Sequence, residues 1–258
     1  MKSTLKYCAL LLFSAAAMIL SAAEMPLGNL RANGIIDVKT PVYTLSFFPG
    51  SMFPFRPGVS GVEIAEPYWL DRLCGEDDTW YFLRVERYAK QEILANTPGE
   101  LKIRITGNFC FDDDRTAPGL PQAIYTYTCT PEMVTISVTL RNPEKKCWKE
   151  VYLVSPAWQR HAWKNFASDQ SQVTAAAEQI FPAKESASVG NPQQTITLFS
   201  GAPMLFTNLS IPVTPVVKRD LFAKEKTIFT GLCGAKLTDW SDPEVTLPEI
   251  KLQIKETK

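Results

Sequence analysis

Histidine is almost absent from this sequence: of 258 residues, only His161 is one. Mechanisms that use two imidazoles are therefore excluded, and a serine or cysteine nucleophile would have to take this one residue as its base. The GxSxG, HExxH, P-loop and dinucleotide-binding motifs are also missing. We therefore assign no catalytic residue and no cofactor, and we favour a protein without enzymatic activity while keeping an enzyme as an alternative.

An excess of positive charge is missing as well. The sequence has 27 Lys and Arg residues against 27 Asp and Glu residues. Binding to a phosphate backbone needs a basic surface, because the release of counterions supplies much of the affinity. We therefore expect no nucleic-acid partner.

Long apolar runs are limited to one, over residues 7–20. Its length of about fourteen residues is short of the roughly twenty that a membrane-spanning helix needs. Two lysines precede the run and small residues follow it as far as Ala23, which is the layout of a cleavable signal peptide. We therefore predict a signal peptide over residues 1–23 and a single domain over residues 24–258 with no membrane span. The expected location is secreted, periplasmic or on the cell surface.

Cysteine pairs with the spacing of metal ligands are absent. No CxxC occurs, and the spacings match no zinc framework, so we predict no metal site. Cleavage after Ala23 would leave five of the six cysteines, and an odd number requires at least one free or intermolecular thiol. Two interpretations stay open, a disulfide between Cys110 and Cys129, or buried apolar thiols.

What the sequence does contain is alternation of apolar and polar residues in short runs separated by Pro and Gly, the pattern of strands with one buried face. The clearest stretch, residues 101–154, predicts an antiparallel meander of four strands, at 101–106, 124–129, 134–140 and 150–154. Further strands are predicted at 35–38, 42–47, 80–88, 195–199, 204–209, 212–217, 227–229 and 250–254.

Only one segment has helical spacing. Val173, Ala176, Ala177, Ile180 and Phe181 would share one face of a helix capped by Ser168 or Asp169. The polar segment 182–194 that follows is predicted to be a mobile loop. With so many strands and a single short helix, the economical fold is an all-β, antiparallel β-sandwich.

The most unusual local composition surrounds the single histidine. Aromatic and planar polar side chains alternate in Trp158, Gln159, Arg160, His161 and Trp163. Sugars offer C–H surface to aromatic rings and hydroxyls to planar polar groups, so we predict a ligand-binding site at these five residues. The alternative is that Trp158 and Trp163 close one end of the core.

Three other segments deserve a hypothesis. Four phenylalanines lie among Pro and Gly in residues 47–58, and they either cap the core or form an exposed apolar loop that meets a partner. The acidic clusters Glu76–Asp78 and Asp112–Asp114 could contribute to a Ca²⁺ site, but a solvated turn is the favoured interpretation for each.

A family resemblance is found in the predicted meander. The runs Ala123–Thr128, Met133–Val138 and Trp148–Leu153 resemble the central sheet of galactose-mutarotase-like β-supersandwich domains. The resemblance covers about residues 101–158 and implies a supersandwich variant of the β-sandwich and a role around carbohydrate. The mutarotase pattern uses two histidines and a carboxylate, and a chain with one histidine cannot meet it. The resemblance therefore implies the fold without the mutarotase activity.

Three functions follow from these observations. The first is a secreted, non-catalytic carbohydrate-binding or glycan-processing accessory protein, which requires an aromatic platform for a glycan. The second is a structural or adhesive cell-envelope protein, which requires an exposed apolar patch around Phe53 and Phe55 for a protein partner. The third is a polysaccharide-acting enzyme of the lyase or epimerase type, with His161, Tyr125 or Tyr127 as base and Arg160 beside a developing anion. We favour them in that order.

Overall fold

A computed structural model gives the fold of most of the chain. It describes residues 25–59, 62–63, 66–67, 71–83, 86–111, 115–153, 156–157, 165–168, 172–174, 180–184, 186–190, 194–201, 204–207, 209–212, 227–230 and 235–256. Every strand pair in these ranges is antiparallel. The described residues contain no helix long and apolar enough to cross a membrane.

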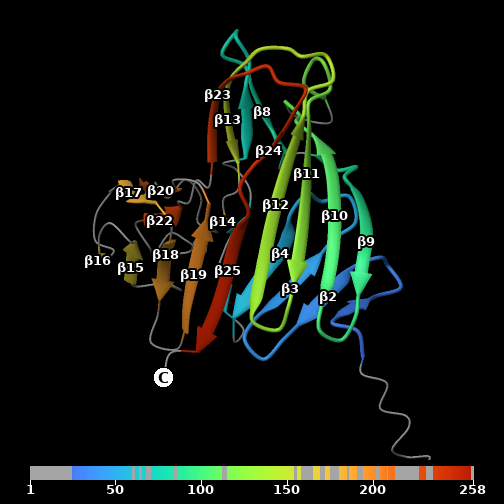
Figure 1. Cartoon of the computed structure of the whole chain (residues 1–258), viewed down its shortest axis with the longest axis vertical. Coiled ribbons are helices and arrows are strands. Elements are labelled where there is room, and N and C mark those ends of the chain that lie inside the picture. The colour runs from blue at the N-terminus through green and yellow to red at the C-terminus, as the bar shows by residue number, and fades with distance from the viewer. Residues whose placement is uncertain are drawn as a thin grey trace, which may run out of the picture.

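The largest sheet has ten strands and runs across the whole view in Figure 1. Its order is β16-β15-β18-β19-β25-β12-β11-β10-β9, with β24 beside β12. The strands on one side of the centre are β9 (Lys90–Asn96), β10 (Leu101–Asn108), β11 (Gln122–Cys129), β12 (Met133–Arg141) and β24 (Glu244–Thr246). The others are β15 (Asn165–Ser168), β16 (Gln172–Thr174), β18 (Ser186–Gly190), β19 (Gln194–Ser200) and β25 (Ile250–Glu256).

A second sheet of five strands packs against the β9–β12 side of the first (Figure 1). It consists, in spatial order, of β1 (Gly28–Leu30), β2 (Ile36–Lys39), β3 (Thr44–Phe47), β4 (Pro54–Val59) and β5 (Val62–Glu63). Phe47 of β3 meets Tyr127 of β11 edge to face, with ring centroids 5.3 Å apart. The core therefore lies between the two sheets, as in a sandwich, and its members come from the alternate buried positions of the strands.

Four strands form a third sheet at the top of Figure 1, in the order β23-β13-β7-β8. They are β7 (Arg72–Cys74), β8 (Trp80–Phe82), β13 (Trp148–Leu153) and β23 (Ala235–Trp240). Three two-stranded sheets complete the described structure: β6 (Glu66–Pro67) with β14 (Pro156–Ala157), β17 (Ile180–Ala183) with β20 (Met204–Thr207), and β21 (Leu209–Pro212) with β22 (Thr227–Thr230).

The predicted all-β antiparallel fold is confirmed, and three strands of the predicted meander pair in sequence order, β10 with β11 and β11 with β12. The prediction is wrong for the fourth strand, residues 150–154, which does not pair with the third strand, β12. The polar segment after Arg141 leads the chain out of the large sheet, and β13 pairs with β7 and β23. β12 instead takes β24 and β25, which are more than a hundred residues away along the chain.

The predicted short helix is wrong at the positions that the structure describes. Val173 lies in β16 and pairs with Phe166 of β15, while Ile180 and Phe181 lie in β17 and pair with β20. The backbone N–H and C=O groups of these residues therefore bond to neighbouring strands, whereas in a helix they would bond within the segment. Local sequence does not reveal such cross-strand partners. Residues 175–179 lie outside the described ranges. The predicted loop 182–194 also contains a strand, β18.

No disulfide joins the cysteines at described positions. Cys74, Cys110 and Cys129 are buried, and Cys147 is exposed. Of the two interpretations, the structure agrees with buried apolar thiols and does not contain the Cys110–Cys129 disulfide. Burial raises the pKa of the Cys129 thiol to about 12, and a hydrogen bond with Tyr43 opposes this shift.

Candidate functional site

The predicted ligand-binding residues Trp158, Gln159, Arg160, His161 and Trp163 lie outside the described residues. The strands that lead to them are described. β14 ends at Ala157, immediately before Trp158, and pairs with β6. In the chain, β13 precedes β14 and β7 follows β6. β13 and β7 pair with each other in the four-stranded sheet. The strand that precedes Trp158 in the chain, β14, thus belongs to a two-stranded sheet with β6 and is separate from the four-stranded sheet.

That sheet places an arginine over two neighbouring aromatic rings. The guanidinium carbon of Arg72 lies 4.3 Å from the ring centroid of Trp80 and 5.0 Å from that of Tyr152. The two ring centroids are 6.1 Å apart, and the ring planes differ by 41°. A positive charge over the negative face of an aromatic ring is stabilising, typically by about 0.5–2 kcal/mol.

The register of the strands explains this arrangement. Arg72 of β7 stands opposite Tyr152 of β13, and the neighbouring position Leu73 stands opposite Val151. Leu73 and Val151 are fully buried in the core. Because side chains alternate across a sheet, Arg72 and Tyr152 lie on the face turned away from the core, where both are half-buried.

A carboxylate completes this group of side chains. The Tyr152 hydroxyl donates a hydrogen bond of 3.0 Å to Oε2 of Glu150, two positions earlier on the same face of β13. The Nε atom of Arg72 is buried and has no hydrogen-bond partner among the described residues. We call Arg72, Trp80, Glu150 and Tyr152 the aromatic–arginine cluster.

The turn between β7 and β8 positions Trp80. Asp77 accepts hydrogen bonds from the Thr79 backbone N–H (3.1 Å) and the Thr79 hydroxyl (2.9 Å), and these bonds lower the pKa of Asp77. Asp78 has a positive φ of 61° and pairs with Lys149 of β13, which raises the pKa of Lys149. The predicted solvated turn at Glu76–Asp78 is therefore found, and Asp78 links it to β13. The second acidic cluster, Asp112–Asp114, lies outside the described residues.

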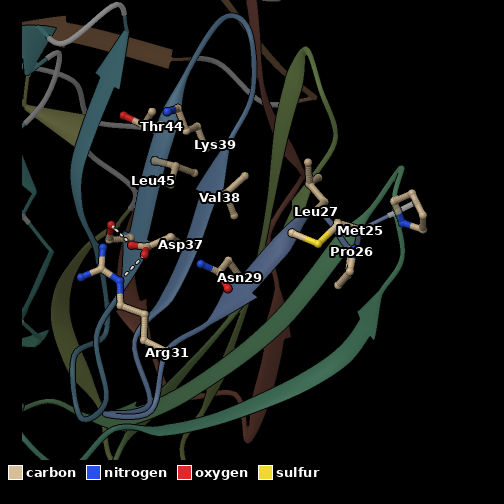
Figure 2. A pocket seen from close by; sticks show the side chains of 12 residues that line it. Met25, Pro26, Leu27, Asn29, Arg31, Asp37, Val38, Lys39, Thr44 and Leu45 are labelled. Carbon is tan, nitrogen blue, oxygen red and sulfur yellow. Dashed lines mark hydrogen bonds and ion pairs between the residues drawn. The ribbon is translucent and has the colours of Figure 1, made fainter. Parts of the chain in front are cut away.

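A second feature is a hollow of about 550 Å³ on the five-stranded sheet (Figure 2). Its polar lining includes Asn29, Arg31, Asp37, Lys39 and Ser46, and apolar residues from the segment 25–27 line another part. Arg31 donates from Nε to Oδ2 of Asp37, and the Ser46 hydroxyl donates to Oδ1 of the same carboxylate over 2.7 Å. Sequence reasoning did not single out any of these residues.

The tyrosines considered as catalytic bases are buried. Tyr125 and Tyr127 are 1% and 2% exposed and stack with ring centroids 5.9 Å apart. Burial, reinforced by the charge of Asp71, raises the pKa of Tyr127 well above its ordinary value. A tyrosine that stays protonated inside the core cannot serve as a base for an external substrate, so this part of the enzyme hypothesis is wrong for Tyr127.

The apolar loop considered as a protein-binding patch is also in the core at its described side chains. Phe53 is 6% exposed and meets Tyr125 edge to face, with centroids 5.7 Å apart. Phe47 is fully buried as well. Phe55 lies within β4, so its segment forms a strand instead of an irregular loop. Core capping is therefore the correct interpretation for Phe47 and Phe53.

Comparison with solved structures identifies the fold. YeaD from Salmonella typhimurium, a proposed mutarotase, shares 8% identity with this chain and has a TM-score of 0.50, covering 95% of this chain and 100% of that one. A galactose mutarotase related enzyme from Lactobacillus acidophilus shares 6% identity, with a TM-score of 0.50 and coverage of 87% and 97%. The GH36 α-galactosidase AgaB from Geobacillus stearothermophilus shares 8% identity with this chain and has a TM-score of 0.54. The match covers 89% of this chain but only 41% of AgaB.

These likenesses show that the chain has the galactose-mutarotase-like β-supersandwich fold. At such low identities they establish the fold alone. No model of a protein family matches the sequence, and no curated protein matches it.

Proposed function

We propose that this chain is an exported, non-catalytic carbohydrate-binding or glycan-processing accessory protein. The observation that carries the proposal is the aromatic–arginine cluster on the outward face of the four-stranded sheet. It gathers two half-buried aromatic rings, the guanidinium of Arg72 over them and the carboxylate of Glu150 at the Tyr152 hydroxyl. This is the combination that binds the C–H faces and hydroxyls of a sugar ring.

The sequence-based prediction of a sugar-binding segment at residues 158–163 concerns the same ligand class. The structural neighbours named above include a proposed mutarotase and an α-galactosidase, which are proteins of carbohydrate chemistry. The single histidine argues for binding without turnover. The predicted signal peptide over residues 1–23 supports a location in the periplasm, on the cell surface or in the medium, where we propose that glycans are its partners.

A glycan-array screen of residues 24–258 tests the proposal. Trp80→Ala and Arg72→Met should each weaken binding about tenfold or more, because they remove stacking surface and a charged donor. The matched control is Tyr88→Ala, since Tyr88 is a tyrosine 72% exposed outside the cluster and should leave binding unchanged. Circular dichroism and thermal unfolding confirm that each variant is folded.

Two further measurements separate the parts of the proposal. Trp158→Ala and Trp163→Ala show whether the predicted segment shares the ligand. Mass spectrometry of the bound glycans after prolonged incubation should find them unchanged, whereas cleaved or isomerised glycans would contradict the non-catalytic role. Absence of binding across a broad array, or equal losses in the cluster variants and in Tyr88→Ala, would reject carbohydrate binding at the cluster.

A further inference from the structure

The hollow on the five-stranded sheet is lined by a row of polar side chains that the strand register creates. Asn29 of β1 stands opposite Asp37 of β2, and Asp37 stands opposite Ser46 of β3. Side chains directly opposite each other across a ladder lie on the same face with Cβ atoms about 5 Å apart. Lys39 lies two positions along β2 from Asp37, on the same face and about 7 Å away along the strand.

Within this row, the carboxylate of Asp37 is fully engaged. One oxygen accepts the Ser46 hydroxyl at 2.7 Å, and the other accepts Nε of Arg31. Asp37 is largely covered, with a side chain 18% exposed, whereas the Arg31 side chain is 55% exposed. Asp37 therefore fixes the orientation of Arg31 and leaves the outer nitrogens of the guanidinium for another acceptor.

The remaining groups of the hollow that can bind a ligand are mainly donors. Figure 2 shows the Arg31–Asp37 pair toward one end, Lys39 toward the other, and Asn29 between the pair and Met25. Lys39 and Asn29 are exposed, and neither side chain has a bonding partner in the part of the chain that the structure describes. One arginine and one lysine against one carboxylate leave the hollow with a net positive charge.

We propose that this hollow is a second binding site, for a small hydroxylated carboxylate such as a uronic acid. The carboxylate of the ligand meets Arg31 and Lys39, its hydroxyls meet the Asn29 amide, and its C–H surface lies against the Met25–Leu27 segment. The volume of about 550 Å³ is within the range of roughly 300–1,000 Å³ of small-molecule sites and exceeds what a bare inorganic anion needs. The site lies on a different sheet from the aromatic–arginine cluster and does not rest on the proposed function.

The test is a titration of residues 24–258 with sodium glucuronate, followed by ¹H–¹⁵N NMR and calorimetry. The expected result is saturable shifts of the backbone amides of Asn29, Arg31 and Lys39. Glucose, which has the hydroxyls without the charge, and phosphate, which has the charge without the sugar ring, should each bind at least fivefold more weakly. Raising the salt concentration should weaken glucuronate binding, because the charges are exposed to solvent.

Three substitutions locate the charge recognition. Lys39→Gln and Arg31→Gln should weaken glucuronate binding about five- to tenfold, the loss expected for one charge-assisted contact near the surface. Lys251→Gln is the matched control, because Lys251 is also exposed on a strand but does not line the hollow. Lys39 makes no ion pair in the described structure, so its replacement keeps the test valid even if Arg31→Gln disturbs Asp37.

Several results would overturn the proposal. Equal binding of glucose and glucuronate would remove the role of charge, and equal binding of phosphate would reduce the site to a general anion site. Equal losses in Lys39→Gln and Lys251→Gln, or amide shifts confined to the four-stranded sheet, would place the ligand elsewhere. A failed glycan array leaves this titration unaffected, so the two proposals fail separately.

Discussion

Glu86 shows how this protein satisfies a buried charge with neutral donors. Its side chain is 6% exposed. Oε1 accepts the Tyr88 backbone N–H at 2.8 Å, and Oε2 accepts the backbone N–H (2.8 Å) and the side-chain amide (3.1 Å) of Asn108. Asn108 is the last residue of β10, so this one carboxylate joins the chain before β9 to the end of the neighbouring strand.

Replacing Glu86 should therefore be costly even when the shape of the side chain is kept. In Glu86→Gln an NH₂ group would face a backbone N–H, and the free energy of unfolding should fall by about 2–4 kcal/mol. The measurement is urea denaturation, with the exposed Glu132→Gln as control. A loss below about 0.5 kcal/mol would show that the three hydrogen bonds contribute little.

The buried thiol of Cys129 predicts how stability depends on alkaline pH. Its pKa is raised by burial to about 12 in the folded state, against an ordinary value of 9.0. Below pH 9 the thiol is protonated in both the folded and the unfolded protein, so it does not make stability depend on pH. As pH rises from 9 toward 12, the thiol ionises in the unfolded chain but not in the folded one, and the folded state loses stability. The free energy of unfolding should fall by about 1.4 kcal/mol per pH unit in this window, with Tyr127 adding to the slope above pH 10.

Urea denaturation between pH 7 and pH 11 measures that slope in the wild type and in Cys129→Val, which keeps the volume and removes the ionisable group. The comparison uses slopes, because the substitution also changes stability at neutral pH. An identical slope in the two proteins would assign the alkaline loss to other groups.

At the scale of elements, the connection after β3 depends on a glycine. Gly50 has a φ of +79° and bridges to Ala89, the residue before β9. A Cβ atom at Gly50 would lie 2.2 Å from the carbonyl oxygen of Arg87. Gly50→Ala should therefore destabilise the protein by at least about 2 kcal/mol, since both the backbone conformation and the space forbid the methyl group.

Gly99 offers the matched control for this substitution. A Cβ atom at Gly99 would have no neighbour within 4 Å, and its φ is not in the left-handed region. Gly99→Ala should change the free energy of unfolding by no more than about 0.5 kcal/mol in the same thermal or urea measurement. If both variants behaved alike, the close contact at Gly50 would not be the cause.

The elements that sequence could predict are those whose partners are near in the chain. Apolar and polar residues alternate at Leu101, Ile103 and Ile105, and a short turn at residues 130–132 joins β11 to β12. These local patterns were enough to predict the hairpins. β13 has equally good alternation, but its partners lie about eighty residues earlier and later in the chain. Alternation gives the face of a strand and says nothing of its neighbour.

The same limit explains why the aromatic–arginine cluster was missed. Trp80 and Tyr152 are unremarkable in the sequence, and Arg72 has no motif around it. Only the register that sets Arg72 opposite Tyr152 brings the three side chains together. The hollow likewise depends on the β1–β2–β3 register, although the proximity of Asn29, Arg31 and Asp37 in the chain could have hinted at it.

At the scale of the whole molecule, β25 joins the two sides of the large sheet. It pairs with β12 on one edge and with β19 on the other (Figure 1). Ile254→Asp would place a charge at a position that is 3% exposed, and it should cost more than about 4 kcal/mol. Because both sides share this strand, they should unfold together in one transition.

Lys255→Asp is the control for that variant, since the neighbouring side chain is exposed. It should leave the thermal midpoint nearly unchanged. Circular dichroism together with hydrogen exchange of β11 and β19 amides follows the two sides independently. Loss of protection in β19 alone in Ile254→Asp would show that the sides are separate cooperative units.

The central place of β25 also sets the timing of folding during biosynthesis. The ten-stranded sheet cannot close until residues 250–256 have left the ribosome, although most of its other strands are made long before. Until then β12 and β19 have open edges, and non-local pairing of this kind forms slowly.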